Sequence, residues 1–265
     1  MIALIVISFF VAAFAVQIFM RRARRHARLY GADMPQRFHK GHVPRLGGAG
    51  IILGMGVAWL AAGITGTDPF NVSWPVSASM LMLVCILPAV LGGIVEDVTQ
   101  RVQVRWRLML TLGAALLVCW VHGLSLARTG IPLLDGWLAA VPYASVLFAA
   151  LAIGGLPHAF NIIDGYNGLA GTVAVLVCLA ISHVALQLGD RQLAAMMVCL
   201  VGATFGFLIW NYPRGKIFAG DGGAYVWGMV IAVACVTLVQ RHRVCLLYTS
   251  PSPRDLSTSR MPSSA

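Results

Sequence analysis

The residues best suited to chemistry in this sequence are a few acids that stand beside glycines. The chain has only nine Asp and Glu residues among its 265 positions. Glu96 and Asp97 form one pair, and Asp164 and Asp221 follow in later glycine-containing segments. Carboxylates are ligands that Mg²⁺ prefers, and glycine lets backbone N–H groups approach phosphate oxygens closely. The pattern therefore predicts a site for a divalent cation and a phosphate or diphosphate.

The elements that position these acids must be apolar. Hydrophobic residues make up 59% of the chain and charged residues 11%, with a mean hydropathy of +0.82. Soluble domains carry roughly 25% charged residues, and an apolar run of about 20 residues is long enough to cross a bilayer as a helix. We therefore predict an all-α fold, a polytopic transmembrane helical bundle. Its eight expected spans are 2–20, 47–66, 76–95, 108–126, 141–160, 167–187, 193–211 and 223–240.

The distribution of basic residues predicts which loops share a side of the membrane. The segment 21–45 holds eight Lys and Arg residues, whereas the loops expected on the other side hold only Arg128 and Arg191. Basic loops stay in the cytoplasm, so the four acids at the span ends also face it. The expected location is the bacterial inner membrane, multi-pass, with a cytoplasmic active site.

The formal net charge of +10 does not indicate nucleic-acid binding, because the basic residues follow the loops between spans. Membrane lipids are the expected partners, and we expect no nucleic-acid partner. The six cysteines form no Cys-x-x-Cys pair and are interpreted as small core residues.

The C-terminal segment differs from the rest in composition. Between Leu246 and Ala265, 11 of 20 residues are Ser, Thr or Pro. We predict one integral-membrane domain over 1–244, incomplete at its C-terminus, and a disordered, non-native tail over 245–265. A genuine short polar tail is the alternative.

Four segments carry a resemblance to a known family. They are HKGHVPRLGGAGI (39–51), GGIVEDVTQRVQVRWRL (92–108), NIIDGYNGLAG (161–171) and NYPRGKIFAGDGGAY (211–225). Together they resemble the polyprenyl-phosphate N-acetylhexosamine-1-phosphate transferases, which include the phospho-MurNAc-pentapeptide translocase. The resemblance implies a ten- or eleven-helix fold, of which about eight spans are present. It also implies a cytoplasmic cleft for a nucleotide-sugar and Mg²⁺, or Mn²⁺ in its place, with a groove for the lipid.

The resemblance assigns roles to residues that match its motifs. Glu96 and Asp97 match an acidic pair usually written Asp-Asp, and with Asp164 they are the expected catalytic carboxylates. Asp221, with Asp164, is the expected metal ligand. The expected substrate-binding residues are His39, Arg45, Asn161, Asn167, Lys216 and Phe218, the last by stacking on uracil. The family's His-rich loop has no counterpart here.

The expected activity is transfer of a sugar-1-phosphate, such as GlcNAc-1-phosphate, from a UDP-sugar to undecaprenyl or another polyprenyl phosphate. UMP is released, and a cell-envelope polysaccharide such as the O-antigen of lipopolysaccharide is initiated. The alternatives are a UDP-MurNAc-pentapeptide donor, a membrane transporter and a non-catalytic scaffold. The oligomeric state stays open, with a homodimer among the options.

Overall fold

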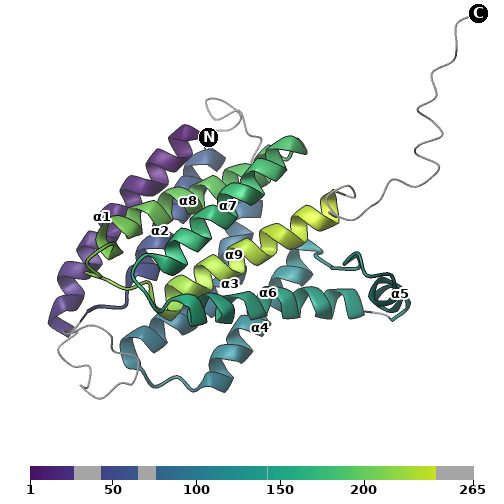
Figure 1. The fold of residues 1–265 in the computed structure, drawn as a ribbon, viewed down its shortest axis with the longest axis horizontal. Helices are drawn as coiled ribbons and strands as arrows, with labels where there is room; N and C mark the ends of the chain where they lie inside the picture. Colours follow the sequence, from purple (N-terminus) through teal and green to yellow (C-terminus); the bar gives the residue numbers. More distant parts are fainter. Residues whose placement is uncertain (27–42, 65–75, 142, 243–265) are drawn as a thin grey trace, which may run out of the picture.

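The computed structural model describes residues 1–26, 43–64, 76–141 and 143–242, and within them every regular element is a helix (Figure 1). In this described part of the chain, seven helices are long and apolar enough to cross a membrane. The expected polytopic helical bundle is therefore confirmed. The helices are α1 (Ile2–His26), α2 (Gly47–Ile64), α3 (Val76–Thr99), α4 (Val104–His122), α5 (Pro132–Ala140), α6 (Ala144–Ile163), α7 (Leu169–Gln187), α8 (Arg191–Asn211) and α9 (Gly220–Arg241).

Helix α2 follows the expectation as far as the structure describes it, whereas helix α5 departs from it. The described part of the span expected at 47–66 is helix α2, which has 18 residues. Helix α5 was not expected, because its nine residues reach only about 13 Å and cannot form a membrane-length apolar run. Pro132 stands in its first turn, where proline's missing N–H costs nothing. Figure 1 shows α5 beyond one end of α6, beside the bundle.

Helix α9 is the core element of the bundle. It packs against α2, α3 and α6, and nearly all of its residues are buried, including Tyr225 and Trp227. Helix α8 lies between α1 and α7, and the indole N–H of Trp210 donates to the carbonyl of Ala13 across the α8–α1 contact. Peripheral helices instead expose large apolar side chains such as Phe10 and Trp120, as lipid contact requires.

Glycine sets how closely α3 approaches α9. A Cβ added at Gly93 would lie 2.7 Å from the backbone nitrogen of Gly222 and 2.8 Å from the carbonyl carbon of Asp221. Those atoms are main chain and cannot rotate away. Small residues in membrane-helix interfaces allow such close backbone approach. The end of α3 that bears Asp97 is thereby held against the start of α9.

Several expectations concern residues outside the described ranges. These are His39, most of the first basic loop and the tail over 245–265. Among the cysteines, Cys85, Cys119, Cys178 and Cys199 are buried as expected, whereas Cys235 is exposed.

We predict that Gly93→Ala lowers the free energy of unfolding by about 1–3 kcal/mol, because the added methyl group forces two backbones apart. Gly155→Ala is the matched control, since it is also inside a helix but a Cβ there meets nothing within 4 Å. That control should be neutral or stabilising by up to about 1 kcal/mol. Thermal unfolding in detergent, followed by circular dichroism, measures both. Equal stability of the two variants would contradict the assigned contact.

Candidate functional site

The four predicted acids lie at one end of the bundle. Glu96 and Asp97 are in the last turn of α3, Asp164 follows α6, and Asp221 is in the first turn of α9. The same end holds Arg107, in the first turn of α4. Three separate span ends thus bring carboxylates together, as the sequence predicted.

Asp97 caps helix α9 from a different helix. Its Oδ1 accepts a hydrogen bond from the backbone N–H of Asp221, and its Oδ2 accepts one from Gly222, both at 2.9 Å. Ala219, the residue before the helix, offers no side-chain cap, so Asp97 supplies the acceptors that the first N–H groups need. Its charge also suits the positive end of the helix dipole.

Gly220 makes room for this cap. Its φ of +71° lies in the left-handed region that favours glycine. A Cβ here would also collide with both carboxylate oxygens of Asp97 and with the carbonyl of Arg45. The Gly-Asp sequence of the motif therefore has a structural reason: glycine lets the carboxylate of Asp97 reach the helix terminus.

Asp221 is buried, at 4% exposed, and its carboxylate is held on both sides. Its Oδ2 accepts a hydrogen bond from the guanidinium of Arg107, and its Oδ1 accepts one from the side-chain amide of Asn161 at 2.7 Å. A buried charge needs such partners to offset its lost hydration. Asn161 thus binds Asp221. The sequence analysis expected Asn161 to bind substrate and did not predict this contact.

Arg107 is the functional residue that the sequence analysis missed. It was counted with the loop before an expected helix at 108, but α4 begins at Val104. This start places Arg107 inside a candidate membrane span, on the helix itself. An ionisable residue within an apolar span is the signal that could have identified it.

Asp164 differs from the other acids in its environment. Its side chain has no hydrogen bond or ion pair with any described residue, and it lies at the C-terminus of α6, where the helix dipole disfavours negative charge. Burial is the main cause that raises the pKa of the Asp164 carboxyl to about 6; Arg45 lowers this pKa and nearby Asp221 raises it, each by a smaller amount. A cation at this position would stabilise the ionised carboxylate.

Glu96 has a local partner. Its Oε2 accepts a hydrogen bond from the backbone N–H of Val102 at 2.7 Å, across the turn between α3 and α4. This bond fixes the turn that leads from Asp97 to Arg107. Asp is the usual residue at this position of the family motif. The longer side chain of Glu96 allows its carboxylate to reach the N–H of Val102.

Arg45 and Phe218 lie in two segments joined by main-chain hydrogen bonds. The N–H of Phe218 donates to the carbonyl of Pro44, and its carbonyl accepts from Gly47, both at 2.9 Å. Gly48 donates likewise to Ala219 at 2.9 Å. We call these three bonds the backbone ladder. It places Arg45 close enough to act electrostatically on Asp164.

The remaining predicted residues lie on neighbouring loops. The Asn167 side-chain amide donates to the carbonyl of Pro213 at 3.0 Å, which ties the α6–α7 loop to the α8–α9 loop. Buried Asn211 reinforces the tie by accepting from the N–H of Gly168 at 2.6 Å. The exposed Lys216 carries its ammonium 5.6 Å from the centre of the Trp210 ring.

The available oxygen donors suit a magnesium ion that arrives with phosphates. Among the described residues, no three His, Cys, Asp or Glu side chains converge as a ready-made metal site. Asp97 and Asp221 each accept hydrogen bonds at both carboxylate oxygens, whereas the side chain of Asp164 accepts none from a described residue. An ionised carboxylate has about four lone-pair sites, so a carboxylate that accepts two hydrogen bonds can still contribute to a cation site. Mg²⁺ is usually bound by one or two carboxylates, with substrate phosphates and waters completing the shell.

Comparisons with known proteins agree with this geometry. A family model described as glycosyl transferase family 4 matches residues 79–239, which include all four acids of the site and Arg107. A probable undecaprenyl-phosphate N-acetylglucosaminyl 1-phosphate transferase of Bacillus subtilis (strain 168) is 30% identical over 237 residues. The match covers 86% of this chain and 62% of that relative.

A second kind of relative carries a different name. A phospho-N-acetylmuramoyl-pentapeptide-transferase of Streptococcus thermophilus (strain ATCC BAA-250 / LMG 18311) is 24% identical over 214 residues, covering 78% of this chain and 62% of the relative. One from Moorella thermoacetica is 33% identical over 101 residues, covering 38% and 32%. The chain thus spans less than two thirds of the length of these curated relatives.

We predict that Arg107 and Asp221 are energetically coupled. A double-mutant cycle of Arg107→Gln and Asp221→Asn should give a coupling of about 1–3 kcal/mol in the free energy of unfolding, since the pair is largely buried. The control cycle uses Arg241→Gln and Asp190→Asn, an ion pair whose arginine side chain is 49% exposed, compared with 21% for Arg107. That pair should couple by less than about 1 kcal/mol. A coupling energy between Arg107 and Asp221 no larger than that of the control pair would contradict the assigned ion pair.

Proposed function

Because the chain belongs to glycosyl transferase family 4, we propose that it transfers a sugar-1-phosphate from a UDP-sugar to a polyprenyl phosphate. Undecaprenyl phosphate is the proposed acceptor, since the Bacillus subtilis relative carries that lipid in its name. GlcNAc-1-phosphate is the proposed transferred group for the same reason.

One observation carries the proposal beyond family membership. Carboxylates from three separate span ends converge with Arg107 and Arg45 at one end of the bundle. That end is where a lipid phosphate at the membrane surface can meet a water-soluble nucleotide while its prenyl chain stays in the bilayer. Carboxylates and arginines together also suit a diphosphate that carries a bound cation: the carboxylates can bind the cation and the arginines the phosphate oxygens.

The proposed reaction is a phosphoryl substitution. An oxygen of the lipid phosphate attacks the sugar-linked phosphorus of the UDP-sugar, and a new P–O bond forms. The bond between that phosphorus and the bridging oxygen breaks, and UMP leaves with the electron pair. A phosphate's second pKa is near 6, so the attacking group is largely ionised at pH 7 and needs little general-base assistance.

Several residues of the site have proposed roles in this reaction. Asp164 and Asp221 would hold Mg²⁺, or Mn²⁺ in its place, which supplies charge neutralisation at the diphosphate. Arg45 and the exposed Lys216 bind phosphate oxygens, and Phe218 stacks on the uracil ring. We assign Asp97 a positioning role, because both its oxygens accept backbone N–H groups and orient Asp221.

The comparisons favour one donor over the other. The GlcNAc-named relative is 30% identical over 86% of the chain, and the MurNAc-pentapeptide-named relative is 24% identical over 78%. UDP-MurNAc-pentapeptide is therefore the second candidate donor. The transporter alternative is disfavoured because the site's acids lie at span ends, away from the midplane where transporter sites are found.

The same reasoning supports a place in the cell. The relatives named above are bacterial, and the basic residues Arg45, before α2, and Lys216, after α8, belong to segments at the end of the bundle that holds the acids. We propose the inner membrane, with the site facing the cytoplasm. The product would initiate a cell-envelope polysaccharide, with the O-antigen of lipopolysaccharide as one candidate.

We predict that Asp164→Asn lowers turnover at least about 100-fold, because it removes a carboxylate whose charge the cation and diphosphate require. The assay combines radiolabelled UDP-GlcNAc, undecaprenyl phosphate and Mg²⁺, and it scores UMP and lipid-linked product. Asp135→Asn is the matched control, since Asp135 binds Thr129 and Gly130 in the loop before α5, away from the site. Its activity should equal that of the unmodified chain.

Replacing the donor separates the candidates. Lipid-linked product from UDP-MurNAc-pentapeptide but none from UDP-GlcNAc would reverse the assigned donor. Uptake of a solute into proteoliposomes without any UMP release would overturn the enzymatic proposal. An Asp164→Asn chain with full activity and unchanged Mg²⁺ dependence would remove Asp164 from the metal site.

A further inference from the structure

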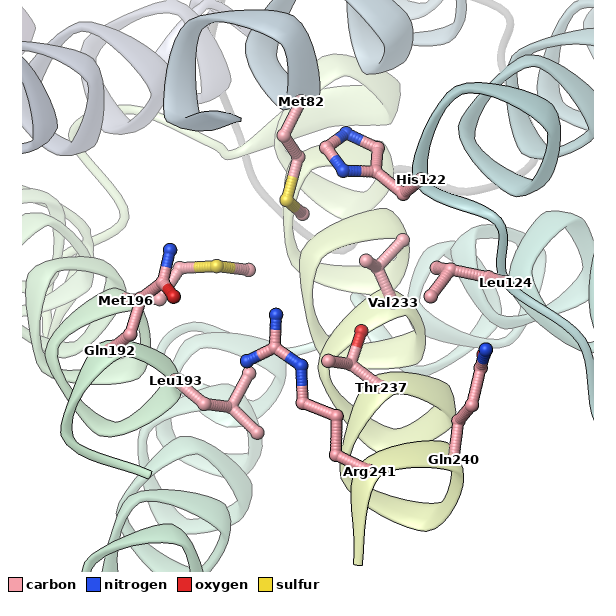
Figure 2. Close-up of a pocket in the computed structure, with 10 residues that line it drawn as sticks. All are labelled: Met82, His122, Leu124, Gln192, Leu193, Met196, Val233, Thr237, Gln240 and Arg241. Carbon is pink, nitrogen blue, oxygen red and sulfur yellow. The ribbon is translucent and has the colours of Figure 1, made fainter. Parts of the chain in front are cut away.

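A cavity of about 150 Å³ lies at the end of the bundle opposite the acids (Figure 2). It is formed by the start of α3, the ends of α4 and α9, and the start of α8, as the lining residues Met82, His122, Gln192 and Arg241 show. Helices α3, α4 and α9 carry the acidic site at their other ends. A single water needs only about 10–15 Å³ of such space, so the cavity is much larger than one solvent site.

Hydrogen-bond donors line the cavity from α8 and α9. Figure 2 shows the Arg241 guanidinium pointing inward from α9, with the Thr237 hydroxyl beside it and the Gln192 amide across from it. Arginine carries five N–H donors, and the hydrogen bond from Arg241 to Asp190, at 3.0 Å, uses one of them. The guanidinium therefore keeps donors for an occupant of the cavity.

His122 adds a polar atom that needs a partner. Its Nε2 is buried and has no hydrogen-bond partner among the described residues. Buried polar atoms are normally satisfied, and an exception calls for water or a ligand. The ring borders the cavity beside Met82 in Figure 2, so an occupant with acceptor oxygens would satisfy it through the Nε2–H tautomer.

The remaining lining is apolar except for Gln240, whose side-chain amide is hydrogen-bonded to Ser125 and Gly123. Met82, Leu193, Met196 and Val233 face the same space. Methionine is flexible and fits irregular hydrocarbon well. The cavity therefore combines hydrogen-bond donors and a positive charge with hydrocarbon surface, at a level where helices of the bundle end.

We propose that this cavity binds the phosphate group of a membrane lipid from the leaflet opposite the acidic site. The phosphate oxygens accept hydrogen bonds from Arg241, Thr237 and His122, and the lipid chain contacts the apolar wall. Arginine matches phosphate with two parallel N–H groups, which makes it suited to this role. Asp190 neutralises part of the charge, so the affinity is modest and decreases with salt.

The test measures lipid-dependent stability of the whole chain in a neutral detergent. Dioleoyl phosphatidylglycerol should raise the melting temperature of the unmodified chain by mass action. The rise should fall by more than roughly half in Arg241→Gln and in Thr237→Val, which removes one hydroxyl with little change in shape. The lipid-induced difference is compared within each variant, so a lower starting stability of Arg241→Gln does not obscure it.

Arg191→Gln is the matched control for Arg241→Gln. It also removes one arginine charge from this end of the bundle, but at an exposed position outside the cavity. Its lipid-induced rise should equal that of the unmodified chain. Parallel samples contain inorganic phosphate or sodium chloride at matched ionic strength. Equal rises in all variants, or a rise reproduced by sodium chloride, would overturn the proposal. A full rise with inorganic phosphate alone would overturn the assignment to a lipid.

Discussion

The site depends on the contact between the Asp97 carboxylate and the first N–H groups of α9. Those bonds join the end of α3 to the start of the most buried helix of the bundle. They orient Asp221 toward Arg107 and Asn161, and they require glycine at position 220. An Asp at 97 therefore has a physical role even before any substrate binds, because a helix terminus buried among other helices needs acceptors for its N–H groups.

Charge balance explains how an apolar bundle tolerates several ionisable groups at one end. Asp221 is offset by Arg107, and Asp97 is offset by the dipole and N–H groups of α9. Asp164 is the acid left without a partner among the described residues, and burial raises its pKa. Asp164 is thus the one carboxylate at this end that has no hydrogen bond or ion pair with a described residue. A cation bound there would stabilise its ionised form.

Much of this architecture could be predicted from residue order. The apolar runs indicated helices, and the placement of acids at their ends indicated a common face, both of which follow from the bilayer's thickness and its low polarity. The partners of those acids could not be read in the same way. Arg107 pairs with a residue 114 positions away, a contact fixed by how α4 and α9 pack. Helix α5 was missed because nine residues give too short an apolar signal.

The backbone ladder between residues 44–48 and 218–219 holds two loops together through main-chain atoms alone. Its hydrogen bonds do not depend on which side chains stand at Arg45 or Phe218. Evolution can therefore exchange those side chains for others while the two strands of loop keep their alignment. A scaffold built this way separates the alignment of the two loops from the side chains that would contact the phosphate and the uracil.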